Sequence, residues 1–273
     1  MTSPPGNLPG AASSAAEHAL RTSFLGPITP PLLARLGEIS DGSLILDLAC
    51  GIGEPSLAVA RLHPGARVLG IDADGTALET ARGRADDEGL GNAEFRAMSF
   101  EDLDLPAASA DAAVSRMGVL LNGNPAAAAR ELARVLRPGA PVSLALWSDV
   151  DDNPYMRLML PALAHVLPGE QVPDPRQRSE VLRSAATVTG WLTQAGIGTV
   201  HSEMLGWTVQ VPDFDAWWSY NTSAGPLNPL FAGLDDDGRR AARARMTQLM
   251  DDERTPSGGY ELHSRCRLVW GTM

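Results

Sequence analysis

The sequence predicts an α/β fold: a doubly wound, mostly parallel seven-stranded sheet with a helical lid or cap. Apolar runs of strand length alternate with helical patterns over residues 43–147, which is the order of βαβ units in a parallel sheet. The first run ends in a glycine turn, as strands do when they lead into a binding loop. Two late strands, separated by a long excursion, are expected to complete the sheet in antiparallel orientation.

Each predicted strand is a short apolar or alternating run. The first begins at Leu44 and ends before Gly51-Ile52-Gly53. The others span residues 66–72, 93–98, 111–116, 141–147, 199–211 and 260–270. One helix is predicted to start at Pro55, and one is capped by residues 151–154 and runs to Val166. Further helices are predicted at residues 17–25, 31–39, 73–88, 125–136, 188–195, 214–220 and 236–252.

Composition divides the chain into four regions. Residues 1–16 are rich in Pro, Gly, Ser and Ala without periodicity, as expected of a flexible N-terminal arm. Residues 17–147 are predicted to hold the N-terminal helices and the ligand-binding core. Residues 148–198 are predicted to form a lid or insertion, and residues 199–273 to complete the sheet and supply inserted helices that form a substrate cap.

Charge and cysteine content narrow the class of partner. The net charge of −11 disfavours nucleic acid and anionic membranes, so a small-molecule substrate is expected and a homodimer is left open. All 22 basic residues are arginine, which excludes a lysine Schiff base. Cys50 and Cys266 lack metal-ligand spacing, so no metal is expected. No run reaches the roughly 18 apolar residues of a membrane span, and no signal-peptide pattern is present, so a cytoplasmic location is expected.

The segment from Asp47 to Gly53, with Asp72 at the end of the next strand, predicts a nucleoside site. The glycines let backbone approach a ligand, and Asp72 can accept both ribose hydroxyls. Glu54-Pro55 stands at the helix start, where a phosphate would need free N–H groups. A nucleoside that carries a positive charge therefore fits better than a pyrophosphate. Alternatively, Asp47 caps a helix and Asp72 is a turn residue.

The motifs of residues 43–147 resemble class I S-adenosylmethionine-dependent methyltransferases, in particular the small-molecule branch similar to the ubiquinone and menaquinone methyltransferases, which have a Rossmann-like fold. The resemblance rests on residues 47–53, 70–73, 99–103, 111–118 and 131–139, which occur in the family's order. It implies S-adenosylmethionine as cofactor and S-adenosylhomocysteine as product. The remainder of the chain resembles the family only loosely.

By position, the resemblance implies contacts between the cofactor and nine residues. The loop from Ala49 through Gly51 to Gly53 supports the methionine part, and Asp72 binds the ribose. Ala73 and Phe100 flank adenine, and Met117 lies beneath the ligand. Many relatives have an acid where this chain has Ser99, so Glu101 could replace that contact. The cofactor residues are Asp47, Ala49, Gly51, Gly53, Asp72, Ala73, Ser99, Phe100 and Met117. Phe100 and Met117 could instead be core residues.

A base is needed only if the acceptor is a hydroxyl, because the sulfonium is already an activated donor. The candidate catalytic residues are His165 on the predicted lid helix and His18 near the N-terminus, ahead of His201 and His263. On the substrate side, aromatic residues between Trp207 and Tyr220 predict an apolar wall; they could equally staple the late helices to the sheet. The candidate substrate-binding residues are Trp207, Trp217, Trp218, Tyr220 and Arg157.

Three functions are compatible with these motifs. The first is methyl transfer to O, N or C of a small, apolar, natural-product-like molecule, of the kind made in secondary metabolism and antibiotic biosynthesis by bacteria. The second is a cyclase or pericyclase type of reaction in which the sulfonium serves only as an electrostatic element. The third is a non-enzymatic binding protein with a degenerate site, which the intact Asp47, Gly51, Gly53 and Asp72 disfavour.

Overall fold

The computed structural model describes residues 20, 23–118, 124–147, 149–172, 184–223 and 227–273. Its centre is one seven-stranded sheet in the order β3-β2-β1-β4-β5-β7-β6. β1 to β5 pair in parallel, and β7 runs antiparallel to both β5 and β6. The strands are β1 (Leu44–Leu48), β2 (Arg67–Asp72), β3 (Ala93–Ala97), β4 (Ala112–Arg116), β5 (Pro141–Trp147), β6 (Gly198–Val211) and β7 (Tyr260–Thr272). The predicted fold class is confirmed.

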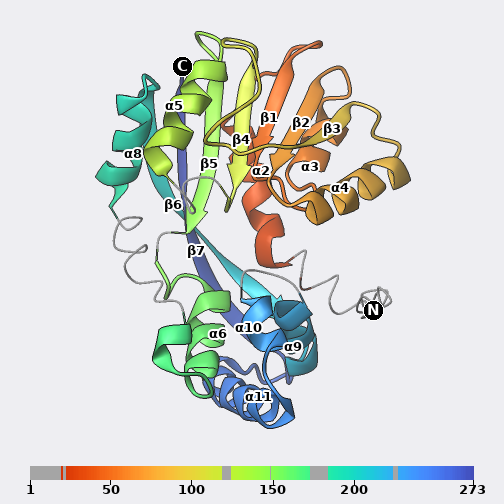
Figure 1. Cartoon of the computed structure of the whole chain (residues 1–273), viewed down its shortest axis with the longest axis vertical. Coiled ribbons are helices and arrows are strands. Elements are labelled where there is room, and N and C mark those ends of the chain that lie inside the picture. The colour runs from red at the N-terminus through yellow and green to blue at the C-terminus, as the bar shows by residue number, and fades with distance from the viewer. Residues whose placement is uncertain (1–19, 21–22, 119–123, 148, 173–183, 224–226) are drawn as a thin grey trace, which may run out of the picture.

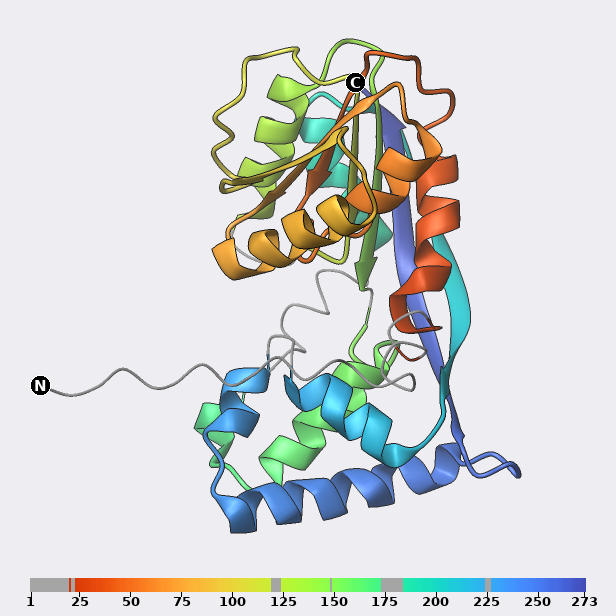
Figure 2. The ribbon, with the colours of Figure 1, turned by 90° about the vertical axis from the view of Figure 1, so that its right-hand side faces the viewer.

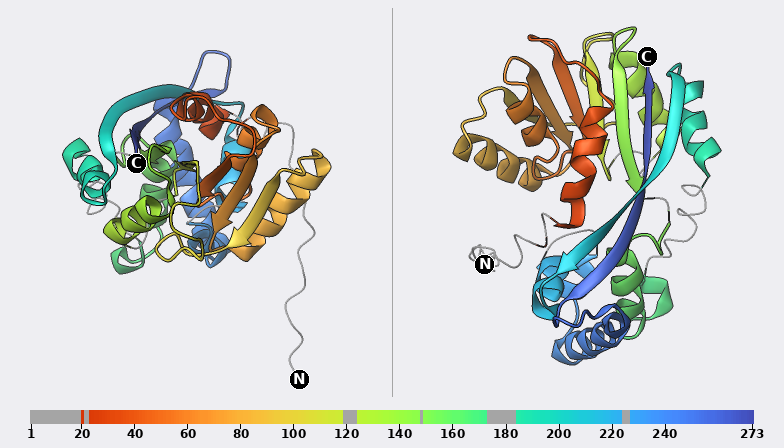
Figure 3. Two further views of the ribbon diagram at one scale, coloured as in Figure 1. Left: turned by 90° about the horizontal axis from the view of Figure 1, so that it is seen from above. Right: turned by 180° about the vertical axis from the view of Figure 1, so that it is seen from behind.

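Helices cover both faces of the sheet. One face packs against α2 (Thr29–Ala34), α3 (Ser56–Leu62) and α4 (Gly75–Asp87), and the other against α5 (Pro125–Val135) and α8 (Ala185–Gln194). Figure 3, seen from above, shows these layers on either side of the strands. Asp74 and Asn124 cap α4 and α5 because their side chains accept from free N–H groups of the first turn.

A second body of helices lies beyond one end of the sheet (Figure 1). It contains α6 (Pro154–Ala164), α9 (Phe214–Ser223), α10 (Asn228–Ala232) and α11 (Asp236–Met250), and we call it the cap. These helices pack around their own apolar core, in which Met159, Trp217 and Met246 are fully buried. The far halves of β6 and β7 join the same core, so these two strands connect cap and sheet (Figure 2).

Most helix boundaries lie close to the predicted ones, with two differences; the predicted arm at residues 1–16 lies outside the described residues, as does most of the helix predicted at residues 17–25. The helix predicted at residues 31–39 is the earlier and shorter α2, and Gly37 beyond its end has φ +68°, which stops a helix. The five-residue α10 was not predicted, because it is too short to show a period. The remaining short turns are the 3₁₀ segments η1 (Gly26–Ile28), η2 (Gly169–Gln171) and η3 (Asp251–Glu253).

Candidate functional site

The carboxyl ends of β1, β2 and β4 meet at one edge of the sheet, the edge that faces the cap. The loop after β1 turns sharply there. Ala49, Gly51 and Gly53 have φ values of 59°, 55° and 103°, a region that glycine enters without strain. A Cβ at Gly51 would meet nothing within 4 Å. The loop therefore presents open backbone at the sheet edge, as a close-fitting ligand requires.

Asp47, in β1, connects the strand before this loop to the helix that follows it. Its side chain is fully buried, and its Oδ2 accepts from the Ser56 N–H (2.8 Å) and the Ser56 hydroxyl (2.5 Å), which fixes the start of α3. Its Oδ1 has no hydrogen-bond partner among the described residues. Burial raises the pKa of Asp47 to about 7, although the bonds from Ser56 and the charge of Arg116 oppose this. Asp47 is thus a buried acid with one unsatisfied oxygen.

Asp72 ends β2 and is tied to the same loop. Its Oδ2 accepts from the Gly51 N–H (2.8 Å), and its Oδ1 accepts from the Asp74 N–H (3.0 Å). The residue is partly exposed, and Ala73 beside it is exposed. Asp72 therefore lies at the mouth of the loop, where a ligand can reach it.

Glu54 does not provide free negative charge at the helix start. Its carboxylate accepts from Arg61 (3.2 Å) and Arg84 (3.1 Å), and Arg61 also binds Glu88. Pro55 precedes α3 without any side-chain cap. The acid and the missing amide are both present, but two arginines already neutralise the acid, so the carboxyl groups that face a ligand belong to other residues.

The segment after β3 carries the two residues predicted near adenine. Ser99 is exposed, and its hydroxyl accepts from the Glu101 N–H (3.2 Å). Phe100 is half-buried and packs on the core that α5 covers. Glu101 accepts from the Asn124 N–H (2.7 Å) and so joins this segment to the start of α5.

The end of β4 lies directly against the first loop. Met117 has φ 64°, and its N–H donates to the Ala145 carbonyl (2.8 Å). Gly118 approaches so closely that an added Cβ would lie 2.1 Å from the Cβ of Ala49. The structure thus brings Met117 beside the loop of Asp47 to Gly53, as a shared ligand site requires.

Arg116, the last residue of β4, was missed by the sequence analysis. Its guanidinium donates to the Thr29 hydroxyl (2.7 Å) and to the carbonyls of Leu25 and Glu54 (both 3.4 Å). Burial lowers its pKa. A basic residue that ends a parallel strand is the signal that could have identified it.

Aromatic rings link the sheet edge to the cap. The ring centroid of Phe24 lies 6.1 Å from that of Trp147, 6.0 Å from that of Trp217 and 6.2 Å from that of Tyr220. The ring centroids of Trp147 and Trp207 are 5.9 Å apart. The Trp207 indole N–H donates to the Phe24 carbonyl (2.8 Å). We call these five residues the aromatic wall. Phe24 and Trp147 were not among the predicted substrate residues, since single aromatic residues carry no sequence signal.

The other two predicted substrate residues have structural partners. Trp218 is buried inside the cap, where it stacks on Phe214 and meets Phe231 edge to face. Arg157 forms an ion pair with Glu253 (2.5 Å) that joins α6 to η3. Trp217, the third predicted residue of the wall, is fully buried.

Three of the described histidines lie at exposed positions, and the fourth, His63, is half-buried at the end of α3. His165 is exposed at the C-terminal end of α6, and His201 and His263 are exposed on β6 and β7. His201 stacks on Trp270 (5.3 Å), and His263 lies 3.4 Å from the Thr208 hydroxyl. His18 falls outside the described residues.

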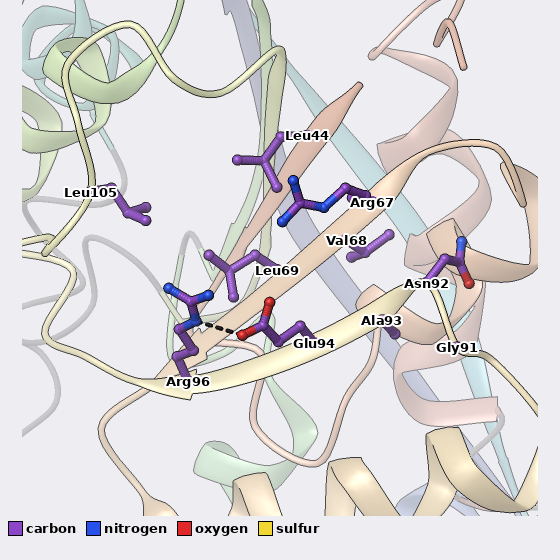
Figure 4. Close-up of a pocket in the computed structure, with 10 residues that line it drawn as sticks. All are labelled: Leu44, Arg67, Val68, Leu69, Gly91, Asn92, Ala93, Glu94, Arg96 and Leu105. Carbon is purple, nitrogen blue, oxygen red and sulfur yellow. Dashed lines mark hydrogen bonds and ion pairs between the residues drawn. The ribbon is translucent and has the colours of Figure 1, made fainter. Parts of the chain in front are cut away.

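A separate hollow lies toward the opposite end of the first strands (Figure 4). It is lined by Leu44, Arg67 and Leu69, and Glu94 pairs with Arg96 at its rim. The loop of Asp47 to Gly53 does not line it. In the described parts of the chain there is no cluster of three metal-ligating side chains, and no helix is long and apolar enough to cross a membrane.

A mixed sheet with β7 antiparallel, and an acid-bearing loop at its carboxyl edge, are features of the Rossmann-like methyltransferase fold. Residues 45–139 match the family described as methyltransferase domain. An uncharacterized protein of Mycobacterium tuberculosis, Rv1405c, is 32% identical over 235 residues, or 83% of this chain and 80% of that protein. The methyltransferase GfsG of Streptomyces halstedii is 37% identical over 123 residues, or 43% of this chain and 42% of that protein.

Solved structures share the fold. A geranyl diphosphate methyltransferase in complex with S-adenosylmethionine aligns with a TM-score of 0.54 at 13% identity, over 96% of this chain and 92% of that one. The [4+2]-cyclase SpnF aligns with a TM-score of 0.54 at 18% identity, over 90% and 80%. The chain belongs to the class I S-adenosylmethionine-dependent methyltransferases. The finer resemblance to the ubiquinone and menaquinone branch stays a prediction.

Proposed function

We propose that this enzyme transfers a methyl group to O, N or C of a small, mainly apolar, natural-product-like molecule. The observation that carries the proposal is the aromatic wall, whose rings from Phe24, Trp147, Trp207 and Tyr220 adjoin the carboxyl ends of β4 and β5. Apolar pockets with few polar groups are typical of sites for small organic ligands. Trp217, which is a member of the wall, and Trp218 both pack in the apolar core of the cap.

The residues at the sheet edge fit S-adenosylmethionine, which supplies an activated methyl group when bound. The unsatisfied Oδ1 of buried Asp47 favours a cation beside the loop, because a cation would stabilise the ionised carboxylate against the cost of its burial. Gly51 leaves open backbone for the methionine part, and Asp72 can accept from ribose hydroxyls. Ala73, Ser99, Phe100 and Met117 stay the proposed residues around adenine and beneath the ligand.

The proposed chemistry requires mainly positioning. For a hydroxyl acceptor that binds in its protonated form, His18 and His165 stay the proposed bases, and the exposure of His165 requires the acceptor to approach the end of α6. The ion pair of Arg157 with Glu253 supports a role in shaping the cap. We therefore rank Tyr220 above Arg157 as a proposed substrate contact.

Calorimetry and mass spectrometry test this proposal. Purified protein should bind S-adenosylmethionine and S-adenosylhomocysteine, and incubation with apolar phenols, amines and enols should yield a product heavier by CH₂. Absence of cofactor binding by the intact protein would refute the proposal.

The alternative is a cyclase that binds the cofactor without using its methyl group. The cyclase SpnF shows that the shared fold also occurs in an enzyme named for ring formation. A product of unchanged mass, formed without S-adenosylhomocysteine, favours this alternative. Formation of S-adenosylhomocysteine in equal amount to the product favours methyl transfer.

A further inference from the structure

Arg116 is a guanidinium whose hydrogen bonds end on neutral oxygens. Nη1 donates to the Thr29 hydroxyl and the Leu25 carbonyl, and Nη2 donates to the Glu54 carbonyl. Nε is buried without an acceptor, and no carboxylate in the described part of the chain forms an ion pair with this residue. The residue as a whole is half-buried.

The neighbouring acids are already engaged. Glu54 is bound by Arg61 and Arg84, and Asp47 is held by Ser56. With its pKa near 7, Asp47 carries only part of a negative charge at neutral pH. A buried guanidinium without a full counter-charge is costly. Arg116 therefore lacks a full counter-charge, although the chain as a whole has a net charge of −11.

Three elements place this cation between cofactor and acceptor. Arg116 ends β4 directly before Met117, and it donates to Glu54 of the first loop. Leu25 and Thr29 bring the N-terminal segment that carries Phe24. From the cap, the ring of Tyr220 lies 6.2 Å from the ring of Phe24. The aromatic wall thus ends in a positive charge.

We propose that Arg116 binds an anionic oxygen of the acceptor, so that the substrates are apolar molecules with an ionised phenol, enol or carboxylic acid. The inference rests on the proposed function. The acceptor loses its proton to solvent on ionisation, and its oxygen supplies the electron pair of the new carbon–oxygen bond. The electron pair of the broken carbon–sulfur bond leaves with the thioether. Such an acceptor needs no protein base, which agrees with the exposed positions of His165, His201 and His263.

Two matched probes test this binding without methyl transfer. By calorimetry with S-adenosylhomocysteine present, 1-naphthoate should bind at least about tenfold tighter than 1-naphthamide, since hydrogen bonds to charged groups are the strong ones. The phenolate arm uses 4-nitrophenol, whose ionisation is visible by absorbance. Bound 4-nitrophenol should be ionised at a lower pH than the free molecule. Which arm shows the effect distinguishes a carboxylate from a phenolate.

Variants separate anion binding from a structural role. Arg116→Gln should abolish the preference for naphthoate and the shift in nitrophenol ionisation, and Arg116→Lys should keep part of both. Thr29→Val removes one acceptor of Arg116 but keeps the cation, so the preference should survive. Arg67→Gln is the control for charge: Arg67 is exposed at the start of β2, beside the hollow of Figure 4, and its loss should leave both readouts unchanged.

Several results would overturn the assignment of Arg116. The first is a wild-type protein that binds naphthoate no better than naphthamide. The second is an Arg116→Gln variant that keeps the preference for naphthoate. The third is loss of this preference in Thr29→Val or Arg67→Gln to the same extent as in Arg116→Gln. Thermal melting of each variant shows whether it is folded, and Arg116→Lys carries the test if the glutamine variant is not. Failure of cofactor binding by the wild type would instead refute the proposed function, since it is measured separately.

Discussion

At the scale of single residues, Asp47 and Asp72 occupy opposite environments at one sheet edge. Asp47 is buried with one oxygen unsatisfied, whereas Asp72 is partly exposed with both oxygens hydrogen-bonded to backbone N–H groups. We propose that the first acts on a ligand by charge and the second by direct contact. Two experiments distinguish these roles.

Asp72→Ala should weaken cofactor binding by more than about tenfold, because charge-assisted hydrogen bonds to the ribose are lost and the Gly51 N–H loses its acceptor. Calorimetry with S-adenosylhomocysteine measures the effect. Asp74→Ala is the matched control: it removes the cap of α4, which costs about 1 kcal/mol of stability, and should leave affinity nearly unchanged. Unchanged affinity in Asp72→Ala would remove this residue from the site.

Asp47 should make the stability of the ligand-free protein depend on pH. Its pKa is raised from 3.8 to about 7 on folding, so the unfolded chain releases this proton before the folded chain does. This residue's contribution to stability therefore falls as pH rises from 3.8 to about 7, and is flat above. Asp47→Asn should gain thermal stability relative to the wild type across that window. A constant difference between the two melting temperatures would contradict the buried, protonated state.

Ionisation of Asp47 lowers the stability of the ligand-free protein but should raise its affinity for the cofactor. An ionised Asp47 attracts a cationic ligand, so affinity for S-adenosylmethionine should rise with pH through about 7. Calorimetry across this range measures the rise, and Asp47→Asn should flatten it. An affinity of the wild type that does not change with pH would argue against the cation lying near Asp47.

At the scale of elements, the site depends on two loops that nearly touch. The loop after β1 and the end of β4 meet at Ala49 and Gly118, where no side chain fits on the glycine. The aromatic wall likewise joins three elements, because Phe24 precedes η1, Trp147 ends β5 and Tyr220 lies on α9. Contacts between elements therefore shape both halves of the proposed site.

Two glycine substitutions should have effects of opposite sign. Gly118→Ala would place a Cβ 2.1 Å from the Ala49 Cβ and should cost about 1–3 kcal/mol, as overpacking does. Gly83→Ala lies inside α4 with nothing within 4 Å and should gain about 0.4–1 kcal/mol by restricting the unfolded chain. Urea unfolding measures both changes. Equal effects would show that the two loops move apart readily.

Phe24→Ala should disturb the wall beyond its cost in stability. Truncation of a buried Phe costs about 3–5 kcal/mol, and Phe24 contacts three other members of the wall. Phe95→Ala is the control, since Phe95 is equally buried but packs beneath α4. Both variants should melt earlier, while only Phe24→Ala should weaken naphthoate binding. Equal binding losses would indicate a general effect of destabilisation.

At the scale of the whole molecule, β6 and β7 bind cap and sheet into one unit. Both strands pair along nearly their full length, and their far ends lie in the core of the cap. Figure 2 shows them passing from one body to the other. Unfolding of the cap would strip apolar cover from Val209 and Leu262, so cap and sheet should unfold together.

Thermal melting with ligand tests this coupling. S-adenosylhomocysteine at about 100 times its dissociation constant should add about 2.7 kcal/mol, which raises the melting temperature of a chain this long by roughly 5–10 °C. Calorimetric scanning should show one transition that moves as a whole. Two transitions, of which only the lower or the upper moves, would show that cap and sheet unfold independently.

The sequence by itself determined the sheet, its parallel core and the residues at the ends of β1 and β2. These features are local: apolar periodicity and glycine turns specify a strand and its loop within a few residues. The same locality explains why residues 47–53 and Asp72 could be predicted to lie together, since consecutive parallel strands end at one edge. In the structure they are in direct contact, because the Gly51 N–H donates to the Asp72 carboxylate.

Only the tertiary structure decided which charges are neutralised and which rings face the site. Glu54 is bound by Arg84, thirty residues away, and Arg116 donates to Thr29, 87 residues away. Phe24, Trp147 and Tyr220 meet across the whole chain. Such partners are set by how helices pack on the sheet, and short-range periodicity carries no information about them. The residues of the proposed cofactor site could therefore be named from the sequence, while the proposed acceptor site with Arg116 became visible only in the folded molecule.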